Sequence, residues 1–118
     1  MSALRSRFLS DSAIRDLAGS HRTPVLALDC DVVRQQYADL QQALPDVGFY
    51  YAIKCFPNTE IVRTLNALGA GFDVATSGEI DMLRDLHVNP RACIHTHPIK
   101  SRRDIHDALR FGCTTFVV

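Results

Sequence analysis

The chain has 118 residues, a length that suits one domain at most, and its 47% hydrophobic and 22% charged residues are typical of a globular protein. Thirteen basic and thirteen acidic residues cancel, which argues against a nucleic-acid-binding protein. No apolar run is long enough to cross a bilayer, and the four cysteines contain no Cys-x-x-Cys pair. We therefore expect a cytoplasmic protein with reduced thiols.

The chain divides into a short N-terminal lead-in and one predicted domain. Residues 1–22 form a polar lead-in with one short helical patch, and the predicted domain covers residues 23–118. The apolar run 25–28 is expected to be a first strand. Asp29 or Asp31 then caps an amphipathic helix.

The remainder alternates between strands and helices. Strands are expected at 49–53, 71–75, 92–96 and 114–118, and the equivalent positions Ala52, Val74, Ile94 and Phe116 are 22, 20 and 22 residues apart. This alternation indicates right-handed β-α-β units and a parallel sheet. The repeat also fits a (β/α)₈ TIM barrel, which usually has about 250 residues. The predicted fold class is therefore α/β, the N-terminal half of such a barrel, ending after its fourth strand.

The last five residues form an apolar, β-rich run with no helix after it. A parallel strand is normally covered on both faces, and an uncovered apolar edge favours pairing with another chain. We therefore expect an N-terminal portion of a longer enzyme, or one half of a split enzyme. The alternative is a small α/β domain that covers this edge in an oligomer.

Lys54 stands at the end of the expected strand 49–53, directly before a turn that contains Pro57. Burial disfavours the ammonium form of a lysine and makes its amine a nucleophile that can condense with an aldehyde. Reactive groups in α/β barrels gather at the carboxyl ends of the strands, where Lys54 is expected. The alternative is a solvated lysine at the rim of the sheet.

Three motifs carry a resemblance to a known family. They are Tyr-Ala-Ile-Lys-Cys at 51–55, Gly-Phe-Asp-Val-Ala at 71–75 and His-Pro-Ile-Lys at 97–100. In this order and spacing they resemble the alanine-racemase-like enzymes that use pyridoxal 5'-phosphate (PLP), and most of all the ornithine/diaminopimelate/arginine decarboxylases. The resemblance extends from about Thr23 to Val118. It implies a PLP-binding barrel of fold type III that decarboxylates ornithine, lysine, arginine or diaminopimelate.

The resemblance also implies roles for three residues. Lys54 matches the lysine that holds the PLP aldehyde as an imine. Asp73 matches an acidic residue close to that lysine, and Ala52 matches a small residue against the cofactor ring. From the residues alone, Asp73 could equally be a solvated or helix-capping aspartate, and Ala52 could fill a tight barrel interior.

A short histidine motif follows the strand expected at 92–96. On a continuous strand, Cys93, His95 and His97 would share one face, as metal ligands can. We expect no metal site, because this spacing lacks the second pair of ligands that a closed zinc site needs. The family usually has an asparagine at the position of His97, so a role in lining the pocket or capping a helix stays open.

The decarboxylase interpretation implies a small amino-acid substrate, and either a homodimer or a complementing chain that supplies the rest of the barrel. The family's glycine-rich phosphate loop has no candidate in this sequence. One alternative is a racemase or PLP carrier with the same barrel, although residues 55–58 depart from the racemase motif. Another is a non-catalytic half-barrel subunit that binds a partner.

Overall fold

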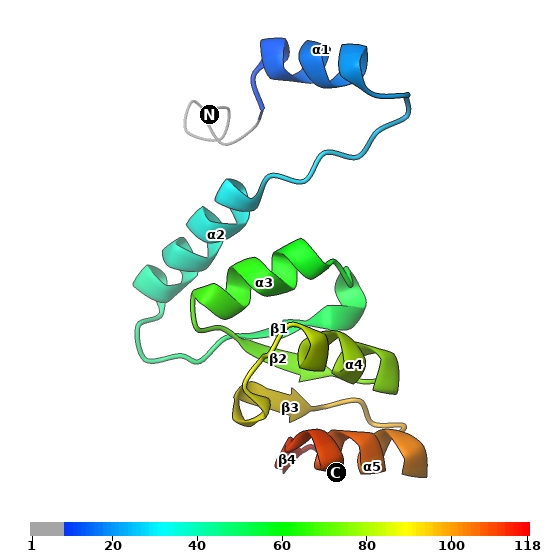
Figure 1. Cartoon of the computed structure of the whole chain (residues 1–118). Coiled ribbons are helices and arrows are strands. Elements are labelled where there is room, and N and C mark those ends of the chain that lie inside the picture. The colour runs from blue at the N-terminus through cyan, green and yellow to red at the C-terminus, as the bar shows by residue number, and fades with distance from the viewer. Residues whose placement is uncertain (1–8) are drawn as a thin grey trace.

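The computed structural model describes residues 9–118, and shows a four-stranded parallel sheet in the order β1-β2-β3-β4 (Figure 1). The strands are β1 (Tyr50–Ala52), β2 (Gly71–Val74), β3 (Cys93–His95) and β4 (Thr115–Phe116). The helices are α1 (Asp11–Ser20), α2 (Cys30–Ala43), α3 (Thr59–Ala67), α4 (Ser77–Asp85) and α5 (Arg102–Phe111), with short 3₁₀ helices η2 (Ile53–Cys55) and η3 (Pro90–Ala92). Strands alternate with helices from β1 onward, which confirms the predicted α/β half-barrel. None of the helices in the described part of the chain is both long and apolar enough to cross a membrane.

The two faces of the sheet differ in burial. Successive strand residues point to opposite faces, and Phe72, Val74 and Cys93 point toward the helices, where each is at most 1% exposed. His95 lies beside Val74 on this face and stacks on Phe116, with the ring centroids 5.6 Å apart. The helices complete the core with Ile61, Val62, Leu65, Ile80, Leu83 and Ala108. The helix-covered face is therefore the dry side of the sheet.

Local sequence signals set the boundaries of α4 and α5. Thr76 accepts a hydrogen bond from the Glu79 N–H, and the Glu79 carboxylate accepts one from the Thr76 N–H. This is the capping box that their spacing predicts. Ser101 and Asp104 form a second box at the start of α5. Gly112 ends α5 in the left-handed region, with φ of 104°, where glycine carries no steric penalty.

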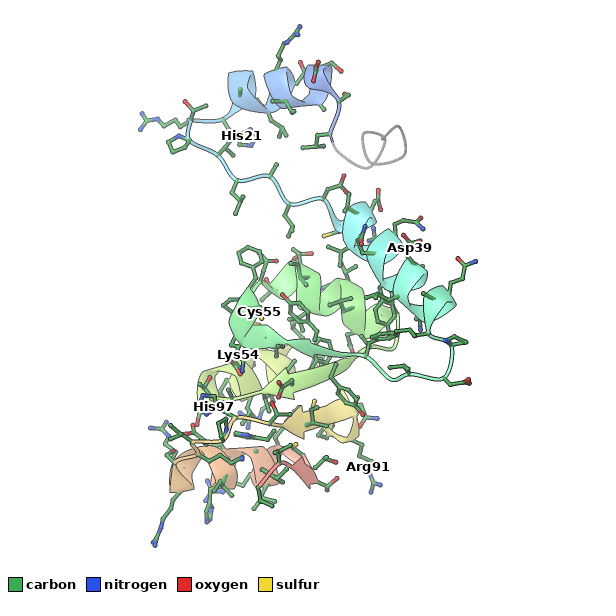
Figure 2. All side chains as sticks on the ribbon, turned by 180° about the vertical axis from the view of Figure 1, so that it is seen from behind. His21, Asp39, Lys54, Cys55, Arg91 and His97 are labelled. Atoms are coloured by element: carbon green, nitrogen blue, oxygen red, sulfur yellow. The ribbon has the colours of Figure 1, made fainter. Side chains whose placement is uncertain are left out.

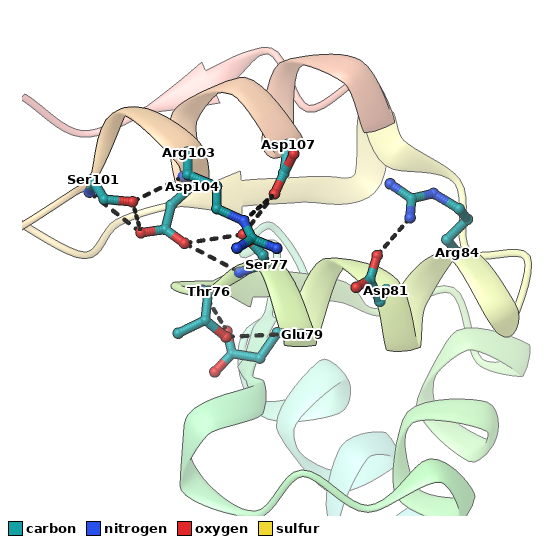
Figure 3. A network of polar contacts seen from close by, with 9 residues as sticks. All are labelled: Thr76, Ser77, Glu79, Asp81, Arg84, Ser101, Arg103, Asp104 and Asp107. Carbon is teal, nitrogen blue, oxygen red and sulfur yellow. Dashed lines mark hydrogen bonds and ion pairs between the residues drawn. The ribbon is translucent and has the colours of Figure 1, made fainter.

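Side chains also join α4 directly to α5 (Figure 3). The Ser77 hydroxyl lies 2.7 Å from Asp107 Oδ2 and 3.2 Å from Asp104 Oδ1, and the Ser77 N–H donates to Asp104 at 3.3 Å. The hydrogen bond from Ser101 is the main reason that the pKa of Asp104 is lowered. The bond from Ser77 likewise lowers the pKa of Asp107. These contacts fix the start of α4, which follows β2 almost directly.

The N-terminal region departs from the predicted first strand. Residues 25–28 form no strand; they run as exposed chain, and Leu26 is 81% exposed. An isolated strand leaves its backbone donors and acceptors unpaired, so the apolar run alone does not produce one. Helix α1 and this segment stand apart from the sheet (Figure 1). The radius of gyration of 17.0 Å accordingly exceeds the ~13.5 Å of a compact domain of this length. Residues 1–8 of the predicted lead-in lie outside the described residues.

Candidate functional site

One row of side chains crosses the open face of the sheet, which is the face opposite the helices. The strand register places Ala52 beside Asp73, Asp73 beside Ile94, and Ile94 beside Thr115. All four are half-buried or exposed, whereas Phe72, Val74, Cys93 and His95 on the helix-covered face are buried. The carboxyl ends of the strands, where barrels hold their reactive groups, lie at or just beyond this row. The predicted site residues Ala52 and Asp73 are therefore neighbours at that edge.

Lys54 lies in the turn η2 that follows β1. The strand ends at Ala52, one residue before the predicted end at Ile53, so Lys54 does not directly follow the strand but lies within the 3₁₀ helix. Fully buried Ile53 anchors the turn, and the Phe56 N–H donates to the Ile53 carbonyl at 3.1 Å. The turn packs against β2, and Figure 2 shows Lys54 and His97 at the same end of the sheet. The turn thus carries Lys54 to the carboxyl edge by a different local structure.

The predicted burial of Lys54 is wrong for this chain. The residue is exposed, and the ion pairs of the described residues include none between Lys54 and Asp73. A barrel buries its interior edge only when strands close the cylinder, and four strands leave that side open to solvent. Nearby, the Tyr51 hydroxyl donates to the Phe56 carbonyl at 2.9 Å. Burial, and then the neighbouring Cys55, raise the pKa of Tyr51.

Asp73 has a hydrogen-bonding partner, Thr96, that sequence reasoning missed. The Thr96 N–H donates to Asp73 Oδ1 at 3.1 Å, and the Thr96 hydroxyl donates to Asp73 Oδ2 at 2.7 Å. Each carboxylate oxygen therefore accepts one bond from the same residue. Hydrogen bonds to an ionised carboxylate are stronger than neutral ones. The side chain of Asp73 is thus held in place at the end of β2.

His95 points into the helix-covered layer, away from the open face. It is 0% exposed, and among residues 9–118 neither ring nitrogen has a hydrogen-bond partner. Burial is the main cause that lowers the pKa of His95, and the positive charge of Lys100 acts in the same direction. The carboxylates of Asp104 and Asp73 oppose this shift. The rule that reactive groups gather at strand ends therefore fails to place His95 in the site.

His97 lies beyond the end of β3. Its Nδ1 is 2.6 Å from the carbonyl oxygen of Ile99, within the loop that leads to α5. Cys93 and His95 do share a face, but the predicted extension of that face to His97 is wrong, because the strand stops at His95. Within residues 9–118, no three His, Cys, Asp or Glu side chains gather in a way that could hold a metal ion.

All four cysteines are free thiols. Burial, with a smaller contribution from Cys113, raises the pKa of Cys93 to about 12. Burial also raises the pKa of Cys113. Thiols with raised pKa values stay protonated at neutral pH and are poor nucleophiles. Cys55, by contrast, is exposed and directly follows Lys54.

Comparison with known proteins identifies the family to which this chain belongs. Residues 30–118 match the family model described as the pyridoxal-binding domain of the pyridoxal-dependent decarboxylases. The chain belongs to this family. The resemblance seen in the three sequence motifs is thereby confirmed at the level of the family.

Similar decarboxylases have been solved with small amines. Lysine/ornithine decarboxylase from Vibrio vulnificus, in complex with putrescine, is 47% identical, with a TM-score of 0.88, and the match covers 94% of this chain and 31% of that one. SrLDC, in complex with PLP and cadaverine, is 34% identical, with a TM-score of 0.87 and coverage of 92% and 29%. Antizyme inhibitor 2 from Xenopus laevis is 40% identical over 82 residues, which is 70% of this chain and 18% of that protein. This chain thus spans less than a third of each relative.

The groups at the carboxyl edge fit PLP chemically. The sequence contains two lysines, and the amine of Lys100 donates to the Val117 carbonyl, whereas Lys54 is exposed. A primary amine is the group that condenses with the aldehyde of PLP. Ala52 has the smallest side chain that a strand residue other than glycine can bring to this position. Asp73 supplies a negative charge next to the turn that carries the amine.

Proposed function

We propose that this chain is the cofactor-binding N-terminal part of a PLP-dependent decarboxylase, with ornithine, lysine, arginine or diaminopimelate as substrate. The match of residues 30–118 to a pyridoxal-binding domain carries the proposal. The relatives in complex with putrescine and cadaverine support a basic substrate, because these diamines are what ornithine and lysine become when they lose their carboxylate.

Each of the three site residues has a distinct task in this proposal. Lys54 would hold PLP through Nζ, which would condense with the cofactor's aldehyde with release of water, and its exposed position leaves the amine open to reaction. Asp73 balances the ammonium charge of Lys54 whenever the lysine is released from the cofactor. Ala52 leaves room for the cofactor ring on the open face of the sheet. Buried Ile53 fixes the point from which the Lys54 side chain extends.

Bound PLP supplies the electron sink for the electron pair that remains when the α-carboxylate leaves. The groups that hold its phosphate and its pyridine nitrogen come, in this proposal, from polypeptide beyond the four strands. That polypeptide is a further part of the same protein, the second copy in a homodimer, or a complementing chain. We also propose a cytoplasmic location, which the four free thiols support.

The test is release of carbon dioxide from each of the four amino acids in the presence of PLP. The protein is purified together with any chain that accompanies it. We expect one or two of the amino acids to be decarboxylated, and Lys54→Ala to reduce the rate to background. Lys100→Ala, the matched variant at the other lysine, should retain the rate. We expect this chain alone to be inactive, so release of carbon dioxide from none of the four by a preparation that contains the rest of the barrel would count against decarboxylation.

A non-catalytic partner subunit is the second candidate function. The similarity to antizyme inhibitor 2, a relative named for inhibition and not for decarboxylation, favours it. Exposed apolar residues lie at both sides of the sheet: Tyr50 in β1 is 48% exposed, and Val117, directly after β4, is 51% exposed. Such residues are suited to contact with another chain. This candidate predicts a second polypeptide that co-purifies in fixed ratio, without PLP absorbance. Stoichiometric PLP in the purified protein would exclude it.

A further inference from the structure

Thr96 holds both oxygens of the Asp73 carboxylate at the carboxyl edge of the sheet. The two donors are its backbone N–H, 3.1 Å from Oδ1, and its hydroxyl, 2.7 Å from Oδ2. The pairing of β2 with β3 explains the contact, because Ile94 lies beside Asp73 and Thr96 follows two residues later, just after β3 ends at His95. The contact therefore joins a strand residue of β2 to the first residue of the loop after β3.

The hydroxyl bond is not needed to pair the strands. Strands β2 and β3 are already paired by their backbones, at Phe72, Asp73 and Val74. The hydroxyl instead fixes the plane of the carboxylate. The terminal torsion of an aspartate is broad and roughly two-fold, so a single bond leaves the group free to turn. Two bonds to opposite oxygens define one orientation.

We propose that Thr96 is a positioning residue for Lys54 that acts through Asp73. The proposal rests on the proposed function, in which Lys54 bonds PLP and Asp73 balances its charge. The turn that carries Lys54 packs against β2, so the fixed carboxylate lies on the neighbouring element. A charge that is already oriented needs no rearrangement when it meets the lysine nitrogen. Thr96 itself touches neither the amine nor the reacting atoms in this role.

The experiment measures PLP binding to Lys54 by titration of the absorption band of lysine-bound PLP. Borohydride fixation and peptide mapping then assign the label to Lys54 or Lys100. The variants are Thr96→Val, which removes the hydroxyl at nearly constant volume, Thr96→Ser, which retains it, Asp73→Asn, and the double variant Thr96→Val/Asp73→Asn. Circular dichroism of each variant shows whether it is folded. The protein is used with any chain that co-purifies.

We expect Thr96→Val to tighten PLP binding at Lys54 by about tenfold at neutral pH, because a less well oriented Asp73 stabilises the competing ammonium form of Lys54 less, and one hydrogen bond to a charged group has an effect of this order. Thr96→Ser should bind within about threefold of the unmodified protein. In the Asp73→Asn background, the valine substitution should add little, because two residues that act as a unit are not additive.

Three results overturn the inference. Equal binding by the unmodified protein and Thr96→Val removes the need for the hydroxyl. An equal change in PLP binding in Thr96→Val and Thr96→Ser, or weaker binding in Thr96→Val, indicates a packing effect. An undiminished effect of valine in the Asp73→Asn background shows that Thr96 does not act through Asp73. If the unmodified protein itself is not labelled at Lys54, the proposed function fails and this inference fails with it. Labelling at Lys54 with no effect of Thr96→Val refutes this inference alone.

Discussion

Replacement of His95 by phenylalanine should stabilise the fold. His95 is fully buried against Phe116, and its two ring nitrogens have no hydrogen-bond partner in the part of the chain that the structure describes. An unpaired buried polar group costs about 1–3 kcal/mol, and the slightly larger benzene ring costs part of that gain through tighter packing. We expect a net rise of about 1–2 kcal/mol in the free energy of unfolding. For a chain of this length that corresponds to roughly 4–8 °C in Tm.

The same substitution should remove a pH dependence. The pKa of folded His95 lies below its ordinary value of 6.5, mainly through burial. The unfolded chain therefore binds more protons below pH 6.5, and stability falls as the pH decreases from 6.5 toward the folded-state pKa. Lys100 adds to this effect, whereas Asp104 and Asp73 reduce it.

Urea unfolding followed by circular dichroism at pH 7.5 and pH 5.5 measures both effects. His95→Phe should be more stable at both values and should lose less stability on acidification than the unmodified chain. His106→Phe, which places the same ring at an exposed position, is the matched control and should show no stabilisation. A His95→Phe variant that is less stable at pH 7.5, or that keeps the full acid sensitivity, would refute the reasoning.

Two further substitutions test the packing around the site. Gly71→Ala would place Cβ 2.4 Å from the Tyr50 ring and 3.0 Å from the Ala92 carbonyl oxygen, so the free energy of unfolding should fall by about 1–3 kcal/mol. Gly78→Ala is the control, because its Cβ would meet nothing within 4 Å and should cause no loss of stability. Equal effects of the two substitutions on the free energy of unfolding would contradict this expectation. Ser77→Ala removes bonds that lower the pKa values of two α5 aspartates from 3.8. It should lower Tm by about 2–4 °C at pH 7 and flatten the loss of stability below pH 3.8, and an unchanged acid profile would disprove that role.

The sequence predicts those features that depend on near neighbours. The capping box of Thr76 and Glu79 spans three residues, and the glycine stop at Gly112 is set by the local φ. The order of strands and helices follows in the same way from local periodicity. The family and its cofactor are evident because the motifs around Lys54 are short and contiguous.

The missed features depend on segments that are distant in the chain. The contact between Thr96 and Asp73 joins residues 23 positions apart and exists only through the register of β2 and β3. The alternation of side chains along a strand predicts that Cys93 and His95 share a face. Which face is buried depends on where the helices pack, and the residues of the strand do not show this. Lys54 is exposed because the four strands do not close into a barrel, and the residues next to the lysine carry no information about barrel closure.

The account depends most on the amine of Lys54, and borohydride reduction of the PLP-treated protein tests it directly. With only two lysines in the sequence, peptide mapping compares Lys54 with Lys100 within one sample. The account predicts a single pyridoxyl label on the peptide that contains Lys54, and its absence after Lys54→Arg. A label confined to Lys100, or spread equally over both lysines, would contradict it.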